Sequence, residues 1–306
     1  MHRRATNIPG VAYLLAALFV LFSVFGPGFA SLPNLLNIGT QSSILLLLAL
    51  PMTLIIMSEG LDLSMGAVLG LAGVILAMLL VNGNGLLAAL AAALAAGVAF
   101  GILNGVLVVT LGMPPFVVTL GTLGVAQGIA LAITDGRSIV GIGRGLPALY
   151  ASTWLGVPFS IVAAVVAYLV FHALLYHTRF GTYVFAIGGN RDALVLAGVP
   201  ANLYHLSIYA LGGLMTGLAA LLLTGRMSAG HPVAAIGMEF DAIAATIIGG
   251  AERGNAWLPG TVLGLLAVGV LKNGLNVMAV PSALQVASIG LLVIVSLLID
   301  SFRRKR

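Results

Sequence analysis

The chain has 306 residues, of which 60% are hydrophobic and only 7% are charged, with a formal net charge of +5. Soluble domains carry roughly 25% charged residues, so the eight acidic and thirteen basic side chains here cannot cover a water-exposed surface. The mean hydropathy of +1.17 therefore predicts an integral membrane protein. The absence of cysteine excludes disulfides, iron–sulfur ligation, thiolate zinc sites and cysteine nucleophiles.

A helix needs about 20 apolar residues to cross a bilayer and must pair its own backbone groups there. The apolar runs predict an all-α polytopic protein of about ten transmembrane helices, one of them short, in a single domain over residues 1–306. The first run exceeds the apolar region of a signal peptide, which is roughly 7–15 residues long, so we interpret it as a retained helix. The predicted spans are residues 11–30, 38–57, 64–82, 86–111, 114–134, 157–177, 203–225, 240–250, 259–279 and 283–300.

Short loops rich in Lys and Arg stay on the cytoplasmic side of a membrane. If the N-terminus is inside, an even number of crossings places the basic C-terminal residues 303–306 inside as well, so both termini are predicted to be cytoplasmic. A nucleic-acid patch is a poor interpretation of a basic cluster beside an apolar helix. The other inside residues are Arg3, Arg4, Arg179, Arg191 and Arg253, and the outside residues are Arg137, Arg144 and Arg226.

Two polar breaks precede apolar runs. Asp62 and Ser64 stand before the third span, and Glu239 and Asp241 stand before the short apolar run 242–248. Such side chains bond the first amides of a helix, and acids complement its dipole. We predict a structural, helix-start role for all four. The alternatives are direct substrate contact in the first break and a half-helix pointing into a pathway in the second.

Lys272 lies well inside the span 259–279, where a cation costs about 2.5–3.5 kcal/mol. It is expected to face a cavity, a partner chain or the bundle interior. Other polar residues within spans could line a hydrated path with it, although an interhelical hydrogen bond is the favoured interpretation of each one individually. They are Asn104, Thr119, Thr122, Gln127, Asn273 and Asn276.

The longest predicted cytoplasmic connection, residues 178–202, contains its own short helix. Asn190 can cap this helix, Asp192 suits its first turn, and Gly198 with Pro200 ends it after about two turns. Docking of a soluble partner is the favoured role, and resting on lipid headgroups is the alternative.

Residues 101–108 are similar in sequence to residues 269–277, and each segment is followed by a helix that starts with proline. The two segments are five helices apart, an odd number, so they run in opposite directions. This arrangement predicts a 5+5 inverted repeat, a common construction of transporters. Small residues four apart, such as Gly97 and Gly101 or Gly213 and Gly217, predict close helix packing.

No residue set for catalysis or metal binding is found. His172, His177 and His205 lack the spacing of metal ligands, and no paired carboxylates or nucleophile–base sets lie at usable spacing. The lysines, Lys272 and Lys305, fit no P-loop. The chain is therefore predicted to be no enzyme and to bind no cofactor or metal. Any ATP-driven role requires a separate ATPase.

Five blocks of sequence share one order with a known family. They are MSEGLDLSMGAVLGLAG at 57–73, NG at 104–105 with PPFVVTLGT at 114–122, AIGGNRDALVLAG at 186–198, GMEFDAIAATIIGG at 237–250 and NGLN at 273–276. Together they resemble permease subunits of ribose-type monosaccharide ABC importers over most of residues 40–300.

The resemblance implies a bacterial inner-membrane subunit that moves a monosaccharide inward. It would work as a homo- or heterodimer of permeases, with cytoplasmic ABC ATPase subunits and a periplasmic or tethered sugar-binding protein. The implied ATPase-coupling residues are Gly189, Asn190, Arg191, Asp192, Ala193, Leu196 and Gly198.

Two departures from the family pattern concern the substrate. Loop 251–260 differs from the usual small-residue loop, and Lys272 stands where an uncharged residue is expected. A cation there could favour an anionic ligand, or could reflect pairing with a different permease chain. The alternative function is an ATP-independent secondary transporter or channel for a small polar solute, which would not need residues 189–198.

Overall fold

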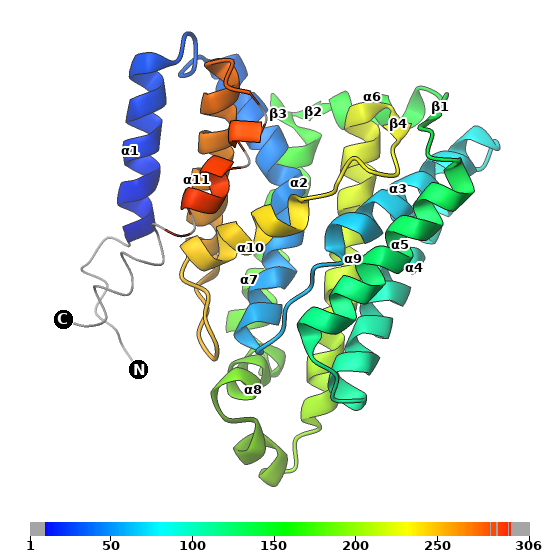
Figure 1. Cartoon of the computed structure of the whole chain (residues 1–306), viewed down its shortest axis with the longest axis vertical. Helices are drawn as coiled ribbons and strands as arrows, with labels where there is room; N and C mark the ends of the chain where they lie inside the picture. Colours follow the sequence, from blue (N-terminus) through cyan, green and yellow to red (C-terminus); the bar gives the residue numbers. More distant parts are fainter. Residues whose placement is uncertain (1–9, 282, 286, 293, 295–306) are drawn as a thin grey trace.

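The computed structural model describes residues 10–281, 283–285, 287–292 and 294. Within them the chain is a bundle of α-helices with four very short strands (Figure 1). Six helices in this part of the chain are long and apolar enough to cross a membrane. They are α2 (Leu32–Met57), α4 with the π-helical turn η1 (Leu86–Gly105 and Val106–Thr110), α5 (Pro115–Thr134), α7 (Phe159–Tyr176), α9 (Ala201–Met227) and α11 (Leu258–Val277).

Other helices complete the bundle, and the all-α prediction is confirmed. They are α1 (Gly10–Phe25), α3 (Met65–Val81), α6 (Gly145–Ala151), α8 (Arg179–Leu196), α10 (Met238–Ile248) and the described part of 283–292. The remainder of the last predicted span and both basic termini lie outside the described residues.

The two ends of the bundle differ in structure. At one end lie α6 and two small antiparallel ribbons, β1 (Ile139–Val140) with β4 (Ala229–Gly230) and β2 (Thr153–Trp154) with β3 (Val157–Pro158). Helix α8 projects from the opposite end (Figure 1). The arginines predicted outside, Arg137, Arg144 and Arg226, flank the ribbon elements, whereas Arg179 and Arg191 lie in α8. The predicted separation of the two arginine groups is therefore present in the fold.

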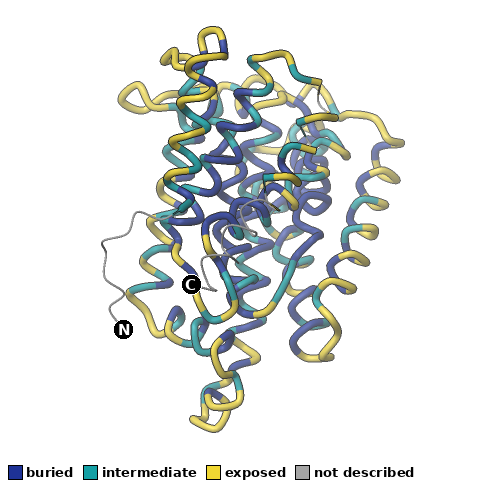
Figure 2. The backbone as a smooth tube through the Cα atoms, turned by 60° about the vertical axis from the view of Figure 1, so that its left-hand side comes forward, coloured by how far each residue is buried: buried dark blue, intermediate teal, exposed yellow. Residues whose placement is uncertain are grey.

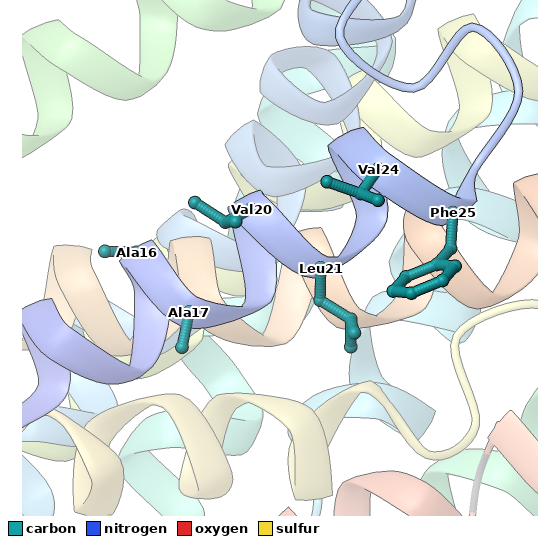
Figure 3. A pocket seen from close by; sticks show the side chains of 6 residues that line it. All are labelled: Ala16, Ala17, Val20, Leu21, Val24 and Phe25. Carbon is teal, nitrogen blue, oxygen red and sulfur yellow. The ribbon is translucent and has the colours of Figure 1, made fainter.

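The helices differ in how much of their surface is buried inside the chain, as expected of a bundle surrounded by lipid. The most apolar stretch of α2 is 83% buried inside the chain, against 28% for α5 and α7, and Figure 2 shows the buried backbone gathered in the middle of the bundle. The outer faces of α5 and α7 carry large apolar side chains, as lipid-facing surfaces do. Figure 3 shows an apolar groove on α1 of the same kind, lined by Ala16, Ala17, Val20, Leu21, Val24 and Phe25.

Helices α4 and α9 make the most extensive contact among the described helices. A Cβ atom at Gly97 would collide with the carbonyl oxygen of Gly213, and one at Gly213 would collide with that of Gly97. Gly101 meets the carbonyl oxygen of Tyr209 in the same way. The glycine spacing therefore packs helices closely, as predicted.

The same order of elements occurs twice along the chain. Helix α2 is followed by the non-helical segment 58–64 and then by α3, α4 and α5. Helix α9 is followed by the largely non-helical segment 228–237 and then by α10, α11 and the helical residues from 283. Helices α4 and α11 run in opposite directions between the two ends (Figure 1). This order supports the predicted inverted repeat.

Candidate functional site

Helices α2 and α3, separated by the non-helical segment 58–64, form what we call the first interrupted helix. A buried polar cluster lies at its break. The carboxylate of Asp62, 3% exposed, accepts the Ser64 N–H at 2.9 Å and the Ser64 hydroxyl at 2.6 Å. Asn104 of α4 donates its amide to Ser64 Oγ at 2.9 Å, and Thr122 of α5 donates to Asn104 Oδ1 at 2.7 Å. These bonds join the segment 58–64 to α4 and α5.

This cluster corrects one prediction and confirms another. Ser64 occupies the N-cap position of α3, but its side chain makes no capping hydrogen bond there. Asp62 bonds Ser64 instead, because an aspartate readily accepts the backbone N–H two residues on. The favoured interhelical interpretation of Asn104 and Thr122 holds. Thr119 is buried and donates only to the carbonyl of Pro115 in its own helix.

Helices α9 and α10, separated by the segment 228–237, form the second interrupted helix. Its second part, α10, begins with two acids, as predicted, and both are buried. Glu239 and Asp241 lie in the first turn of α10 and are 2% and 7% exposed. Both carboxylate oxygens of Glu239 lie 3.1 Å from the Gly237 N–H. Glu239 also occupies the space that a side chain at Gly66 of α3 would need, so the start of α10 packs directly against α3.

Lys272 of α11 forms an ion pair with Asp241. The side chains of Lys272 and Asp241 are 38% and 9% exposed, so Lys272 reaches inward to a carboxylate while part of its length faces the molecular surface. Of the three expected surroundings of Lys272, a cavity, a partner chain or the bundle interior, this contact agrees with the bundle interior. Because Asp241 balances the charge within the chain, the case for an anionic ligand at Lys272 loses its basis.

The remaining predicted pathway residues fall in separate places. Asn273 and Asn34 exchange two amide hydrogen bonds, at 2.8 and 3.1 Å, which join α11 to α2. Gln127 donates to the Pro232 carbonyl at 3.0 Å, and Asn276 is exposed near the end of α11. The hydrogen bonds therefore bring Asn104 and Thr122 together and link Asn273 and Gln127 to other segments. Sequence reasoning missed Asn34, since it precedes the predicted second span.

Helix α8 contains the predicted short helix. The backbone of Asn190 is non-helical, with φ −155° and ψ 89°, so α8 is two helices joined by a kink. Asn190 Oδ1 accepts the Ala193 N–H at 3.0 Å, which is the predicted N-cap. At the other end Gly198 has φ +78°, and its N–H donates to the Val195 carbonyl at 2.9 Å.

The end of this short helix is a Schellman motif. The Val199 N–H donates to the Leu194 carbonyl at 3.3 Å, which completes the paired bonds that an αL glycine permits. Arg191 donates to Asn202 Oδ1 at 2.7 Å and ties the short helix to the start of α9. Leu196, at the tip, is 88% exposed. The segment is thus a defined helical projection (Figure 1), and its helix ends in an exposed leucine.

Three chain segments meet at the base of this projection. The Gly254 N–H donates to the Met57 carbonyl at 2.9 Å. Arg253 donates from Nε to the Gly188 carbonyl at 3.0 Å and forms an ion pair with Glu59. The end of α2, the kink of α8 and the loop between α10 and α11 therefore share one junction.

Comparison with known proteins decides what kind of protein carries these features. The family model described as branched-chain amino acid transport system / permease component matches residues 34–297. The chain belongs to this permease family. The five sequence blocks lie inside the matched region, and the predicted resemblance to ribose-type permeases is confirmed by the relatives that follow.

Curated relatives of the permease match it over nearly their full length. It is 37% identical over 290 residues to the ribose import permease protein RbsC of Bacillus subtilis, covering 94% of this chain and 90% of that protein. It is 32% identical over 295 residues to the D-allose transport system permease protein AlsC of Escherichia coli K12, covering 95% and 90%. The L-arabinose transport system permease protein AraH of the same organism is 32% identical over 298 residues, covering 97% and 91%.

The fold of the permease is also that of a solved transporter. A structure assigned to an inward-facing metal-chelate type ABC transporter superposes with a TM-score of 0.55. The superposition covers 94% of this chain and 99% of the transporter chain, and the two sequences are 13% identical. The likeness concerns the arrangement of the helices, and it agrees with a multi-pass transport permease.

Proposed function

We propose that this permease is the membrane-spanning subunit of an ATP-driven ABC importer that moves a ribose-type monosaccharide into the cytoplasm. The relatives that it matches over nearly their full length import ribose, allose or arabinose by their names, which supports this substrate class.

The short helix 190–196 carries the proposal that the transporter is driven by a separate ATPase. Leu196 is 88% exposed at the tip of a segment that leaves the bundle, and Val195 is 53% exposed. Burial of one such leucine against a partner contributes roughly 1.5–3 kcal/mol. In this proposal, residues 178–202 face the cytoplasm, and Gly189 to Gly198 dock in a cleft of the ATPase. The chain itself hydrolyses nothing.

The other partners follow from the same assignment. A periplasmic or tethered binding protein delivers the sugar to the end that carries α6 and the ribbons, and a second permease chain completes the pathway. The protein then lies in the bacterial inner membrane with α8 and both termini on the cytoplasmic side, as the arginine distribution favours. A secondary transporter would share the inverted repeat but would make no use of Leu196.

Two equally exposed leucines at opposite ends make the test. Leu196 and Leu155 are 88% and 87% exposed. The tagged chain, Leu196→Asp and the control Leu155→Asp are purified from native membranes, and co-purifying P-loop ATPases are identified by mass spectrometry. Cells are assayed in parallel for uptake of radiolabelled ribose, allose and arabinose.

We expect the ATPase to accompany the wild type and Leu155→Asp, and both ATPase binding and uptake to be lost in Leu196→Asp. Uptake that persists in Leu196→Asp, with no ATPase recovered from any sample, would favour the secondary transporter or channel. Uptake of none of the three sugars by a chain that does carry an ATPase would overturn the substrate class alone.

A further inference from the structure

The junction at the base of the projection is held by close backbone contacts. A Cβ atom at Gly188 would collide with the Met57 carbonyl oxygen and lie 2.5 Å from the Gly254 nitrogen. Such backbone atoms cannot rotate aside as a side chain can. Movement of the α8 kink must therefore displace the end of α2 and the loop 249–257 together.

Arg253 connects the three segments through its side chain. Its Nε donates to the Gly188 carbonyl, two residues before the Asn190 kink, and the same Nε pairs with the carboxylate of Glu59 just after α2. The side chains of Arg253 and Glu59 are 67% and 44% exposed, so this ion pair contributes little to stability. Its effect lies in fixing the positions of the segments that it joins.

Two of the three segments joined by Arg253 lead to the two buried polar clusters. Glu59, in a left-handed conformation with φ +66°, starts the segment that ends in Asp62 and Ser64. The loop 249–257 connects α10, which bears Asp241, to α11, which bears Lys272. The junction therefore stands between the kinked helix and both interrupted helices.

We propose that Arg253 is a positioning residue that transmits movement of residues 190–198 to both interrupted helices, and so couples ATP hydrolysis to sugar movement. This inference rests on the proposed function, in which residues 190–198 contact the ATPase. Arg253 itself contacts neither ATP nor substrate. Removing it loosens the connection and leaves the docking surface around Leu196 in place.

The experiment uses the whole complex as purified from native membranes and reconstituted in vesicles. Arg253→Gln and Glu59→Gln are compared with Arg179→Gln. Arg179 is an exposed arginine in the first turn of α8 with no side-chain hydrogen bond or ion pair in the described part of the chain. ATPase bound per permease, ATP hydrolysis and uptake of the radiolabelled sugar are measured on the same preparation.

We expect Arg253→Gln and Glu59→Gln to retain bound ATPase and to hydrolyse ATP, while sugar taken up per ATP falls by about fivefold or more, the size of a typical coupling between sites. The double variant should lose no more than the single variants lose, because both break one connection. Arg179→Gln should behave as wild type.

An unchanged ratio of uptake to hydrolysis in Arg253→Gln would overturn this inference and leave the proposed function standing. Loss of the bound ATPase in Arg253→Gln would also overturn it, because Arg253 would then belong to the docking surface. A wild-type chain that carries no ATPase would overturn the proposed function and this inference with it.

Discussion

Lys272 of α11 pairs with Asp241 at the start of α10, in the place where the first half of the chain has Asn104 of α4 bonded next to Asp62. In each half, an acid lies where the helix resumes after a break, at α3 or at α10. The next helix, α4 or α11, supplies the polar side chain that holds this acid in place. The sequence similarity between residues 101–108 and 269–277 places Asn104 opposite residues 272–273. The two halves thus use an amide in one case and an ion pair in the other.

The first prediction concerns the ion pair between Lys272 and Asp241. Lys272→Met leaves the buried Asp241 carboxylate without a counter-charge and should cost about 2 kcal/mol, less than for a fully buried pair because Lys272 is 38% exposed. The double variant Asp241→Asn with Lys272→Met should recover most of this loss. Apparent melting temperatures of the detergent-solubilised proteins check it. A double variant no more stable than Lys272→Met would show that the two side chains are not coupled.

Neighbouring glycines give a prediction with opposite signs. Gly188→Ala forces a methyl group against the Met57 carbonyl and should cost about 1–3 kcal/mol. Gly189→Ala meets no atom within 4 Å and should be neutral or stabilising by up to about 1 kcal/mol, because alanine favours helix. Melting temperatures of the two variants compare them directly. Equal melting temperatures would contradict the close contact at Gly188.

The Asp62 cluster predicts a difference between two buried polar residues. Asn104→Ala removes the partner of both Ser64 and Thr122 and should cost about 1–3 kcal/mol through unpaired buried groups. Thr119→Val loses only a bond within its own helix and should be nearly neutral. Thermal unfolding measures both variants. If Thr119→Val is the more damaging change, the cluster does not hold α4 to α5 as described.

The arginine distribution predicts orientation, and the lack of native cysteine makes it simple to test. Leu155→Cys and Leu196→Cys each introduce the single thiol of the chain, at opposite ends of the bundle. In intact spheroplasts a membrane-impermeant maleimide should label Leu155→Cys and should reach Leu196→Cys only after permeabilisation. The reverse pattern would place α8 on the outer side and exclude its contact with a cytoplasmic ATPase.

Much of the fold could be predicted from the sequence, because a bilayer leaves few choices for an apolar run. Helix positions follow from the need to pair every backbone group in lipid. The short helix within 178–202 follows from local chemistry: Asn190 caps its start and Gly198 adopts the positive φ that ends it. These signals are short-range, so they can be read along the chain without knowledge of the neighbours.

The parts that could not be predicted depend on distant partners. The Asn34–Asn273 pair joins residues 239 positions apart, and no local pattern relates them. Helix α6 and the two-residue strands are too short to show periodicity and are held by their pairing with other segments. A cap of α3 was expected from Asp62 or Ser64, and Ser64 does not form it because its hydroxyl bonds Asp62 and accepts from Asn104.

The contact between α4 and α9 has a consequence for how this protein can change over generations. Gly97 and Gly213 each occupy the space that the other's side chain would need. Most packed pairs tolerate a larger residue on one side if the other side shrinks, but glycine has nothing left to remove. No change at one glycine can therefore compensate for a larger residue at the other, and each position is restricted to glycine independently.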